Sequence, residues 1–128
     1  MEVLASRLIL HPSVMARSRH FYEQVLGLRI FHEYGDGSGV IGVVYFLGGG
    51  FLELSGATPG RTNGFSTLWL QVPDVGREET RLRGLGIPLA APASRKPWGL
   101  IELPLADPDD HVVILVEVPE DHFLRRQL

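Results

Sequence analysis

The chain has 128 residues, of which 45% are hydrophobic and 21% charged, and its formal net charge is −3 at pH 7. This size and composition are typical of one globular domain with its own hydrophobic core. The slightly acidic balance, without a run of four Lys or Arg, argues against nucleic acid as a partner, and the absence of cysteine excludes disulfides, thiolate catalysis and zinc–thiolate sites.

No apolar stretch approaches the ~20 residues of a membrane-spanning helix, so we expect no membrane partner. The longest stretches, such as Val40–Leu47, are far shorter. The first residues lack a basic segment followed by an apolar one, which is the pattern of a secretory signal. We therefore expect a cytoplasmic protein.

The first half of the chain predicts a strand, a helix and three more strands. Val3–Leu10 alternates in hydrophobicity, as a strand does, whereas Ser13–Leu26 has apolar residues at helical spacing and is followed by Gly27, a natural helix end. Glycine-rich turns then separate three predicted strands, Leu28–Tyr34, Val40–Leu47 and Phe51–Ser55.

After a loop rich in Gly, Thr, Pro and Asn, the same order is repeated. Thr67–Val72 predicts a strand, Asp74 is a good helix N-cap, and Gly84 or Gly86 ends the helix. Acidic residues early in this helix and basic residues late in it suit the helix dipole. Three more strands are predicted at Pro88–Ala93, Leu100–Leu105 and Val112–Val118.

The two halves also match residue by residue. Leu8 and Leu10 correspond to Leu68 and Leu70, sixty residues later. A glycine followed by an aliphatic residue ends both helices, and leucine or valine alternates in both final strands. The sequence therefore predicts a single α+β domain, residues 1–128, made of two βαβββ modules at about 1–58 and 64–119.

Each predicted helix must cover one face of its sheet, and we expect eight alternating aliphatic residues to pack there: Leu8, Leu10, Leu52, Leu54, Leu68, Leu70, Val113 and Leu115. The intervening residues form the opposite face. If the two sheets curl toward each other, this second face lines a concave cup, the kind of place where small ligands bind. Its predicted members are Arg7, Ile9, His11, Phe51, Glu53, Ser55, Thr67, Trp69, Gln71, Val112, Ile114 and Val116.

Several motifs resemble, in order along the whole chain, those of the vicinal oxygen chelate superfamily, which includes glyoxalase I, bleomycin-resistance proteins and extradiol dioxygenases. The motifs are Arg17-Ser18, Phe21-Tyr22, Val25-Leu26-Gly27-Leu28, Phe51-Leu52-Glu53-Leu54, Val72-Pro73-Asp74-Val75, Pro97-Trp98-Gly99 and Asp107-Pro108-Asp109. The resemblance implies paired βαβββ modules around a cup, which agrees with the internal repeat. It also implies a homodimer.

In the metalloenzymes of that superfamily, four side chains bind a divalent metal. The resemblance places those positions at Arg7, Glu53, Thr67 and Ile114. Arg has no lone pair to offer, Ile offers nothing, and one carboxylate does not make a site. None of the five histidines (His11, His20, His32, His111 and His122) has a recognised metal spacing. We therefore expect no metal and no other cofactor.

Arg7 and Glu53 are instead predicted to form an ion pair on the floor of the cup; the alternative is that both simply face water. Glu53 could also serve as a general base or bind a cation. Trp69 on its strand and Trp98 in a turn at the cup mouth are candidates for a stacking wall, the alternative being plain hydrophobic lining. His11, near the rim, and Phe51 complete the candidate site. Phe51 and Tyr45 are weaker aromatic candidates, for which core packing is favoured.

The predicted function is metal-independent binding of a small organic molecule, as in the drug-sequestering branch of the resembled superfamily. The first alternative is an enzyme, a lyase, isomerase or dioxygenase with a displaced metal site or a metal-free one that uses Glu53 and Arg7. The second is an accessory domain with a vestigial cup. A net charge of −3 and one cup carboxylate favour a cationic ligand.

Overall fold

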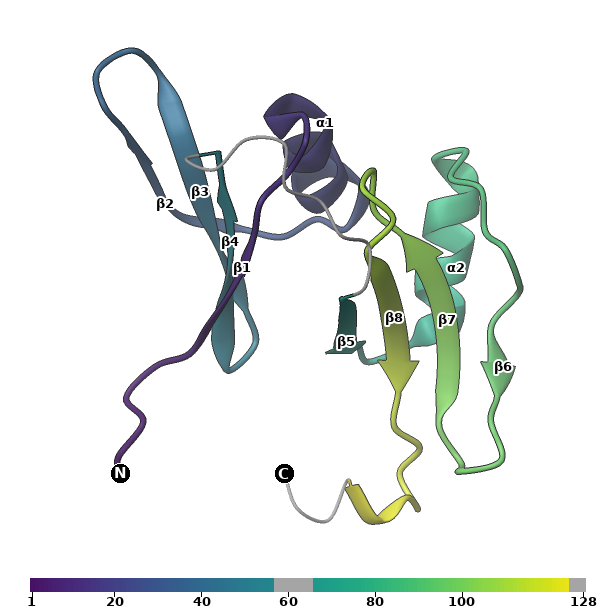
Figure 1. Ribbon diagram of the computed structural model, residues 1–128. Coiled ribbons are helices and arrows are strands. Elements are labelled where there is room, and N and C mark those ends of the chain that lie inside the picture. The colour runs from purple at the N-terminus through teal and green to yellow at the C-terminus, as the bar shows by residue number, and fades with distance from the viewer. Residues whose placement is uncertain (57–65, 125–128) are drawn as a thin grey trace. The chain divides into compact units, whose positions relative to one another are not determined.

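The computed structural model describes residues 1–56 and 66–124, and the chain divides into two compact units, Met1–Asn63 and Gly64–Leu128 (Figure 1). Each unit contains a four-stranded mixed sheet and one helical segment. Within the described ranges, no helix is long and apolar enough to cross a membrane.

The first unit is a βαβββ module. Its sheet has the strand order β1-β4-β3-β2, with β1 parallel to β4 and the other pairs antiparallel. The helix of this unit continues into a π-helical turn, and Gly27 follows it with the positive φ that glycine adopts readily. The elements are β1 (Arg7–Leu10), α1 (Met15–His20), η1 (Phe21–Val25), β2 (Ile30–Gly35), β3 (Val40–Leu47) and β4 (Gly50–Ser55).

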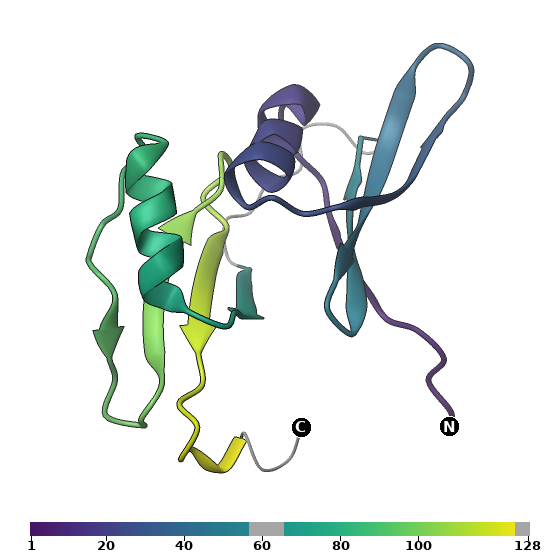
Figure 2. The same ribbon diagram turned by 180° about the vertical axis from the view of Figure 1, so that it is seen from behind.

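The second unit repeats this topology. Its strand order is β5-β8-β7-β6, with β5 parallel to β8, and α2 lies across one face of the sheet (Figure 2). The elements are β5 (Thr67–Gln71), α2 (Val75–Gly84), β6 (Ser94–Arg95), β7 (Ile101–Ala106) and β8 (Val112–Glu117). The predicted α+β class with two βαβββ modules is therefore confirmed.

Six of the eight predicted core residues are buried: Leu10, Leu52, Leu54, Leu68, Val113 and Leu115. Leu70 is half-buried, and Leu8 is exposed, so the prediction was wrong for Leu8. Leu8 lies on β1, which begins at Arg7 and forms the edge of its sheet. A residue near the start of an edge strand lacks a neighbouring strand on one side, and for this reason alternation alone overestimates its burial.

Two strand predictions also need correction. The first strand was predicted to begin at Val3, but β1 begins at Arg7. A strand was predicted at Pro88–Ala93, whereas the structure has only the two-residue β6 at Ser94–Arg95. Pro88 and Pro92 carry no backbone N–H, so this segment cannot donate a continuous ladder of hydrogen bonds.

The two helices differ at their N-termini. The Asp74 carboxylate accepts a hydrogen bond from the Arg77 N–H (3.0 Å), which caps α2 as predicted. Glu117 at the end of β8 adds a second acceptor, for the Val75 N–H (3.0 Å). In contrast, the N-cap of α1 is Val14, which has no side-chain acceptor.

A partly buried polar cluster connects the helical segment of the first unit to its sheet. The Tyr45 hydroxyl donates to Glu23 (2.7 Å), and the Arg19 Nε donates to the same carboxylate oxygen (2.7 Å). Burial raises the pKa of Tyr45, and the bond to Glu23 raises it further, so the hydroxyl keeps its proton. The assignment of Tyr45 to the core is confirmed, because its side chain is fully buried.

Candidate functional site

The centre of the candidate site is the carboxylate of Glu53 on β4, which is only 8% exposed. Arg7 on β1 donates from Nη1 to its Oε1 (2.7 Å), and the Tyr34 hydroxyl on β2 donates to its Oε2 (2.6 Å). The predicted Arg7–Glu53 ion pair is therefore present. Both oxygens are engaged, as a buried carboxylate requires.

Tyr34 reaches Glu53 from two strands away because the strand between them, β3, has a glycine without a side chain at that point. Tyr34 pairs with Gly42 on β3, and Gly42 pairs with Ser55 on β4. A Cβ added at Gly42 would overlap the ring and hydroxyl of Tyr34. The glycine thus lets the tyrosine ring lie across β3 toward the Glu53 carboxylate.

Opposing effects act on the ionisation of Glu53. Burial raises the pKa of its carboxyl, but the hydrogen bonds from Tyr34 and Arg7, the positive charge of Arg7 and the electrostatic influence of His11 lower it. The stabilising interactions win, and the pKa lies below its ordinary value. The bond to Glu53 correspondingly raises the pKa of Tyr34, although a bond with Ser55 offsets part of that effect. At neutral pH Glu53 is a carboxylate and Tyr34 a protonated donor.

Three phenyl rings gather beside this network. The ring centroids of Phe31 and Phe51 are 4.9 Å apart, those of Phe31 and Phe46 5.0 Å, and those of Phe46 and Phe51 5.9 Å. The Arg7 guanidinium carbon lies 5.9 Å from the Phe51 centroid, within cation–π range. We call this surface the Arg7 face; its members are Arg7, Ile9, Phe31, His32, Tyr34, Phe46, Phe51, Glu53 and Ser55.

Sequence reasoning missed four members of the Arg7 face: Phe31, His32, Tyr34 and Phe46. Phe46 and Tyr34 could have been found by pairing alternate positions of β2 and β3 with those of β4. Phe31 could not, because the register shifts between Ile30 and His32, and this irregularity puts Phe31 against Phe46 and Phe51. Such a bulge redirects a side chain without any signal in simple alternation.

The remaining candidate of the first unit is His11, which follows β1. Its Nδ1 lies 3.4 Å from the Ser55 carbonyl oxygen. His11 is half-buried and its electrostatic influence helps to lower the pKa of Glu53, so it belongs to the surroundings of the network.

The candidates of the second unit lie on one face of their own sheet. Trp69 on β5 is 46% exposed and pairs with Ile114 on β8, while Thr67 is exposed two residues earlier. Ile114 packs against an apolar cluster of Leu100, Val116 and Val118, which Leu124 also contacts. Val116, predicted to face the cup, is fully buried there, because the segment after β8 folds back against it.

Trp98 is the most exposed of the aromatic candidates, at 58%. Its indole Nε1 donates to Glu102 on β7 (2.7 Å), and its carbonyl oxygen lies 3.0 Å from His122 Nε2. These contacts fix the turn and leave the indole accessible to solvent.

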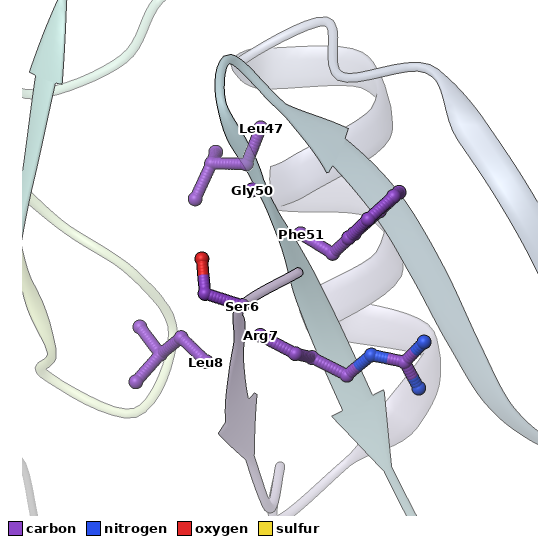
Figure 3. A pocket seen from close by; sticks show the side chains of 6 residues that line it. All are labelled: Ser6, Arg7, Leu8, Leu47, Gly50 and Phe51. Carbon is purple, nitrogen blue, oxygen red and sulfur yellow. The ribbon is translucent and has the colours of Figure 1, made fainter. Parts of the chain in front are cut away.

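An open hollow of about 390 Å³ lies at the end of the first sheet and is lined by Ser6, Arg7, Leu8, Leu47, Gly50 and Phe51. Figure 3 shows that the side chains of Ser6, Leu8 and Leu47 project to one side of the strands and those of Arg7 and Phe51 to the other. Arg7 therefore lies on the same side of the strands as Phe51 and on the opposite side from Leu8 and Leu47, although all four residues line the hollow.

A family model described as the Glyoxalase/Bleomycin resistance protein/Dioxygenase superfamily matches residues 8–115. The chain belongs to this superfamily. No curated protein matches it.

Many solved structures share the fold of this superfamily member. TioX from Micromonospora sp. ML1 matches with a TM-score of 0.74 and 18% identity over 90% of this chain and 98% of that one. TnmS3, an antibiotic binding protein from Streptomyces sp. CB03234, has a TM-score of 0.73 and 20% identity over 92% and 98%. A lactoylglutathione lyase from Agrobacterium tumefaciens has a TM-score of 0.70 and 19% identity over 91% and 94%.

The residues at the family's metal-ligand positions do not fit a metal. Arg7 and Ile114 have no donor atom for one, and each oxygen of Glu53 already accepts a bond from Arg7 or Tyr34. In residues 1–56 and 66–124, no three His, Asp or Glu side chains converge as a metal site would require.

Proposed function

We propose that this protein binds a small organic molecule on the Arg7 face, without a metal. The observation that carries the proposal is the combination of the Arg7–Glu53–Tyr34 network with a cluster of accessible phenyl rings on one sheet face. A largely apolar surface with a few fixed polar groups is the usual make-up of a small-molecule site.

Binding suits the network better than catalysis does. A general base works best when its pKa lies near the working pH and its carboxylate is not held by fixed partners. Both oxygens of Glu53 are engaged, and its pKa is shifted downward, away from neutrality. The similarity to an antibiotic binding protein of the same fold supports a sequestering role, which needs only a complementary surface.

The proposal is tested by screening a library of small organic molecules for an increase in melting temperature, since a ligand that binds only the folded state stabilises it. We expect at least one compound whose effect is lost in Phe51→Ala and kept in Phe123→Ala, which removes an exposed ring from the other unit. Hits unaffected by Phe51→Ala, or no hit, would contradict binding on this face.

Elemental analysis separates this function from a metalloenzyme. We expect the dialysed protein to contain far less than one transition-metal ion per chain, because the donor set at residues 7, 53, 67 and 114 is incomplete. About one equivalent of Zn, Ni, Mn or Fe surviving dialysis would favour the lyase or dioxygenase alternative.

A further inference from the structure

We propose that the ligand of the Arg7 face is a flat aromatic molecule with a negative charge, such as an aromatic carboxylate or a phenolate. This inference rests on the proposed binding function and names the chemical class of the ligand. It reverses the preference for a cation that the sequence alone suggested.

Glu53 is not available to a cationic ligand. Its side chain is nearly buried, and Arg7 and Tyr34 each occupy one of its oxygens. The positive charge of Arg7 already balances that of Glu53, so a cation would have to reach a nearly buried carboxylate and compete with the guanidinium for it. In the described part of the chain, Glu53 is the sole acid of the Arg7 face.

Arg7 is the charged group that a ligand can reach. Its side chain is 43% exposed, and among the described residues its recorded hydrogen bond uses Nη1 only. The guanidinium has five N–H donors in a rigid fork, so its other nitrogens can still bind a carboxylate or phenolate oxygen. The bond to Glu53 holds the fork in position, which lowers the entropic cost of that binding.

The phenyl rings define the rest of the ligand. Phe31 and Phe46 are about half-exposed, and Phe51 lies between them and the guanidinium of Arg7. Aromatic surfaces favour offset or edge-to-face contact with another ring. A ligand whose anionic group meets Arg7 can therefore place an attached ring against this cluster.

The test compares three probes of one shape and different charge: naphthoate, naphthamide and naphthylmethylammonium. Isothermal titration calorimetry of the intact protein is expected to rank them in that order of affinity. Arg7→Gln should weaken naphthoate binding by about tenfold, the equivalent of one charge-assisted hydrogen bond. Naphthamide should change little. Naphthylmethylammonium should gain, because Glu53 loses its ion-pair partner.

The matched control is Arg95→Gln, which removes the same charge from β6 in the other unit and should leave the order unchanged. Arg7→Lys keeps the charge but not the fork, and should retain the preference for the anion at reduced affinity. If Arg7→Gln does not fold, Arg7→Lys is compared with the wild type instead.

A fourth probe, cyclohexanecarboxylate, tests whether the ligand must be aromatic. Phe46→Leu should weaken the binding of naphthoate more than the binding of this non-aromatic acid.

The inference is overturned if naphthylmethylammonium binds the wild-type protein as well as naphthoate does, or if Arg95→Gln has the same effect as Arg7→Gln. It is also overturned if no probe binds while the library screen yields a ligand that depends on Phe51. In that case the binding function stands and only the ligand class is wrong. A library screen without any hit counts against both.

Discussion

At the residue scale, the ionisation of Glu53 is linked to folding. Its pKa is lower in the folded protein than in the unfolded chain, so its contribution to stability is present above the unfolded pKa, about 4.3, and is lost as the pH falls through the folded value. We therefore expect the free energy of unfolding to fall in acid, and to fall less steeply in Glu53→Gln. Urea denaturation at several pH values measures this; the exposed Glu120→Gln is the control and should follow the wild type.

Tyr34 supplies one of the two bonds that lower the pKa of Glu53. Tyr34→Phe should destabilise the protein by about 1–2 kcal/mol at pH 7, the range for a hydrogen bond to a charged group at a partly accessible site. The loss should shrink in acid, where Glu53 becomes protonated. Chemical denaturation at pH 7 and in acid checks both parts, and a loss independent of pH would contradict the assigned role.

Gly42 is required for the approach of Tyr34. Gly42→Ala should cost about 1–3 kcal/mol, because the new methyl group would overlap the Tyr34 ring. Combined with Tyr34→Phe, it should cost less than the sum of the two single changes, since both disturb the same contact. Gly49→Ala is the control: a Cβ there meets nothing within 4 Å. Additive losses would show that Gly42 matters for another reason.

The sequence predicted the Arg7–Glu53 pair because the resemblance and the alternation along their strands both place the two side chains on one face of the sheet, where the resembled metalloenzymes bind their metal. It did not predict Tyr34 as the second partner. That contact depends on the order of the strands across the sheet, which alternation along a single strand does not contain. The position of Phe31 could not be predicted for a different reason, the register shift between Ile30 and His32.

At the element scale, the two helices are unequally capped. Val14 at the N-cap of α1 has extended backbone angles and offers no acceptor, whereas Asp74 caps α2. Val14→Asp should stabilise the protein by about 0.5–1 kcal/mol, through a side-chain acceptor and a negative charge at the helix N-terminus. Asp74→Ala should destabilise it by about 1 kcal/mol. Thermal denaturation measures both, and a lower melting temperature for Val14→Asp would show that the exposed valine has a packing role.

The strands that were easiest to predict have strong hydrophobic patterns between glycine turns; β3 matches its predicted bounds, Val40–Leu47. The hardest was β6, where a proline-containing segment was mistaken for the strand and the pairing begins only after it. The π-helical turn that follows α1 could not be predicted either, because a local change of helical pitch leaves the apolar spacing almost unaltered.

At the scale of the whole molecule, we expect a homodimer, as the superfamily resemblance implies. The strand order supports this expectation: β1 and β5 are edge strands of their own sheets, and Leu8 and Ile9 on β1 are exposed. Sedimentation equilibrium should therefore give twice the chain mass of 14.2 kDa. A single 14.2 kDa species at micromolar concentrations would rule the dimer out.

The two modules of the internal repeat have the same strand order, but the side chains at their corresponding positions differ in chemistry. Arg7 and Glu53 of the first module correspond to Thr67 and Ile114 of the second, where the polar pair is replaced by an exposed hydroxyl and a member of an apolar cluster. This difference can be predicted from the sequence, because the offset between the two halves is enough to identify the corresponding residues. It assigns the charged chemistry of the Arg7 face to one copy of the duplicated unit.

The aromatic residues are divided between the units in a way that gives each an optical signal. All three tyrosines, Tyr22, Tyr34 and Tyr45, lie in the first unit, and both tryptophans, Trp69 and Trp98, in the second. Tryptophan emission therefore follows the second unit, whereas tyrosine absorbance follows the first. Without any label, a spectrophotometer can show whether the two copies melt together or one after the other.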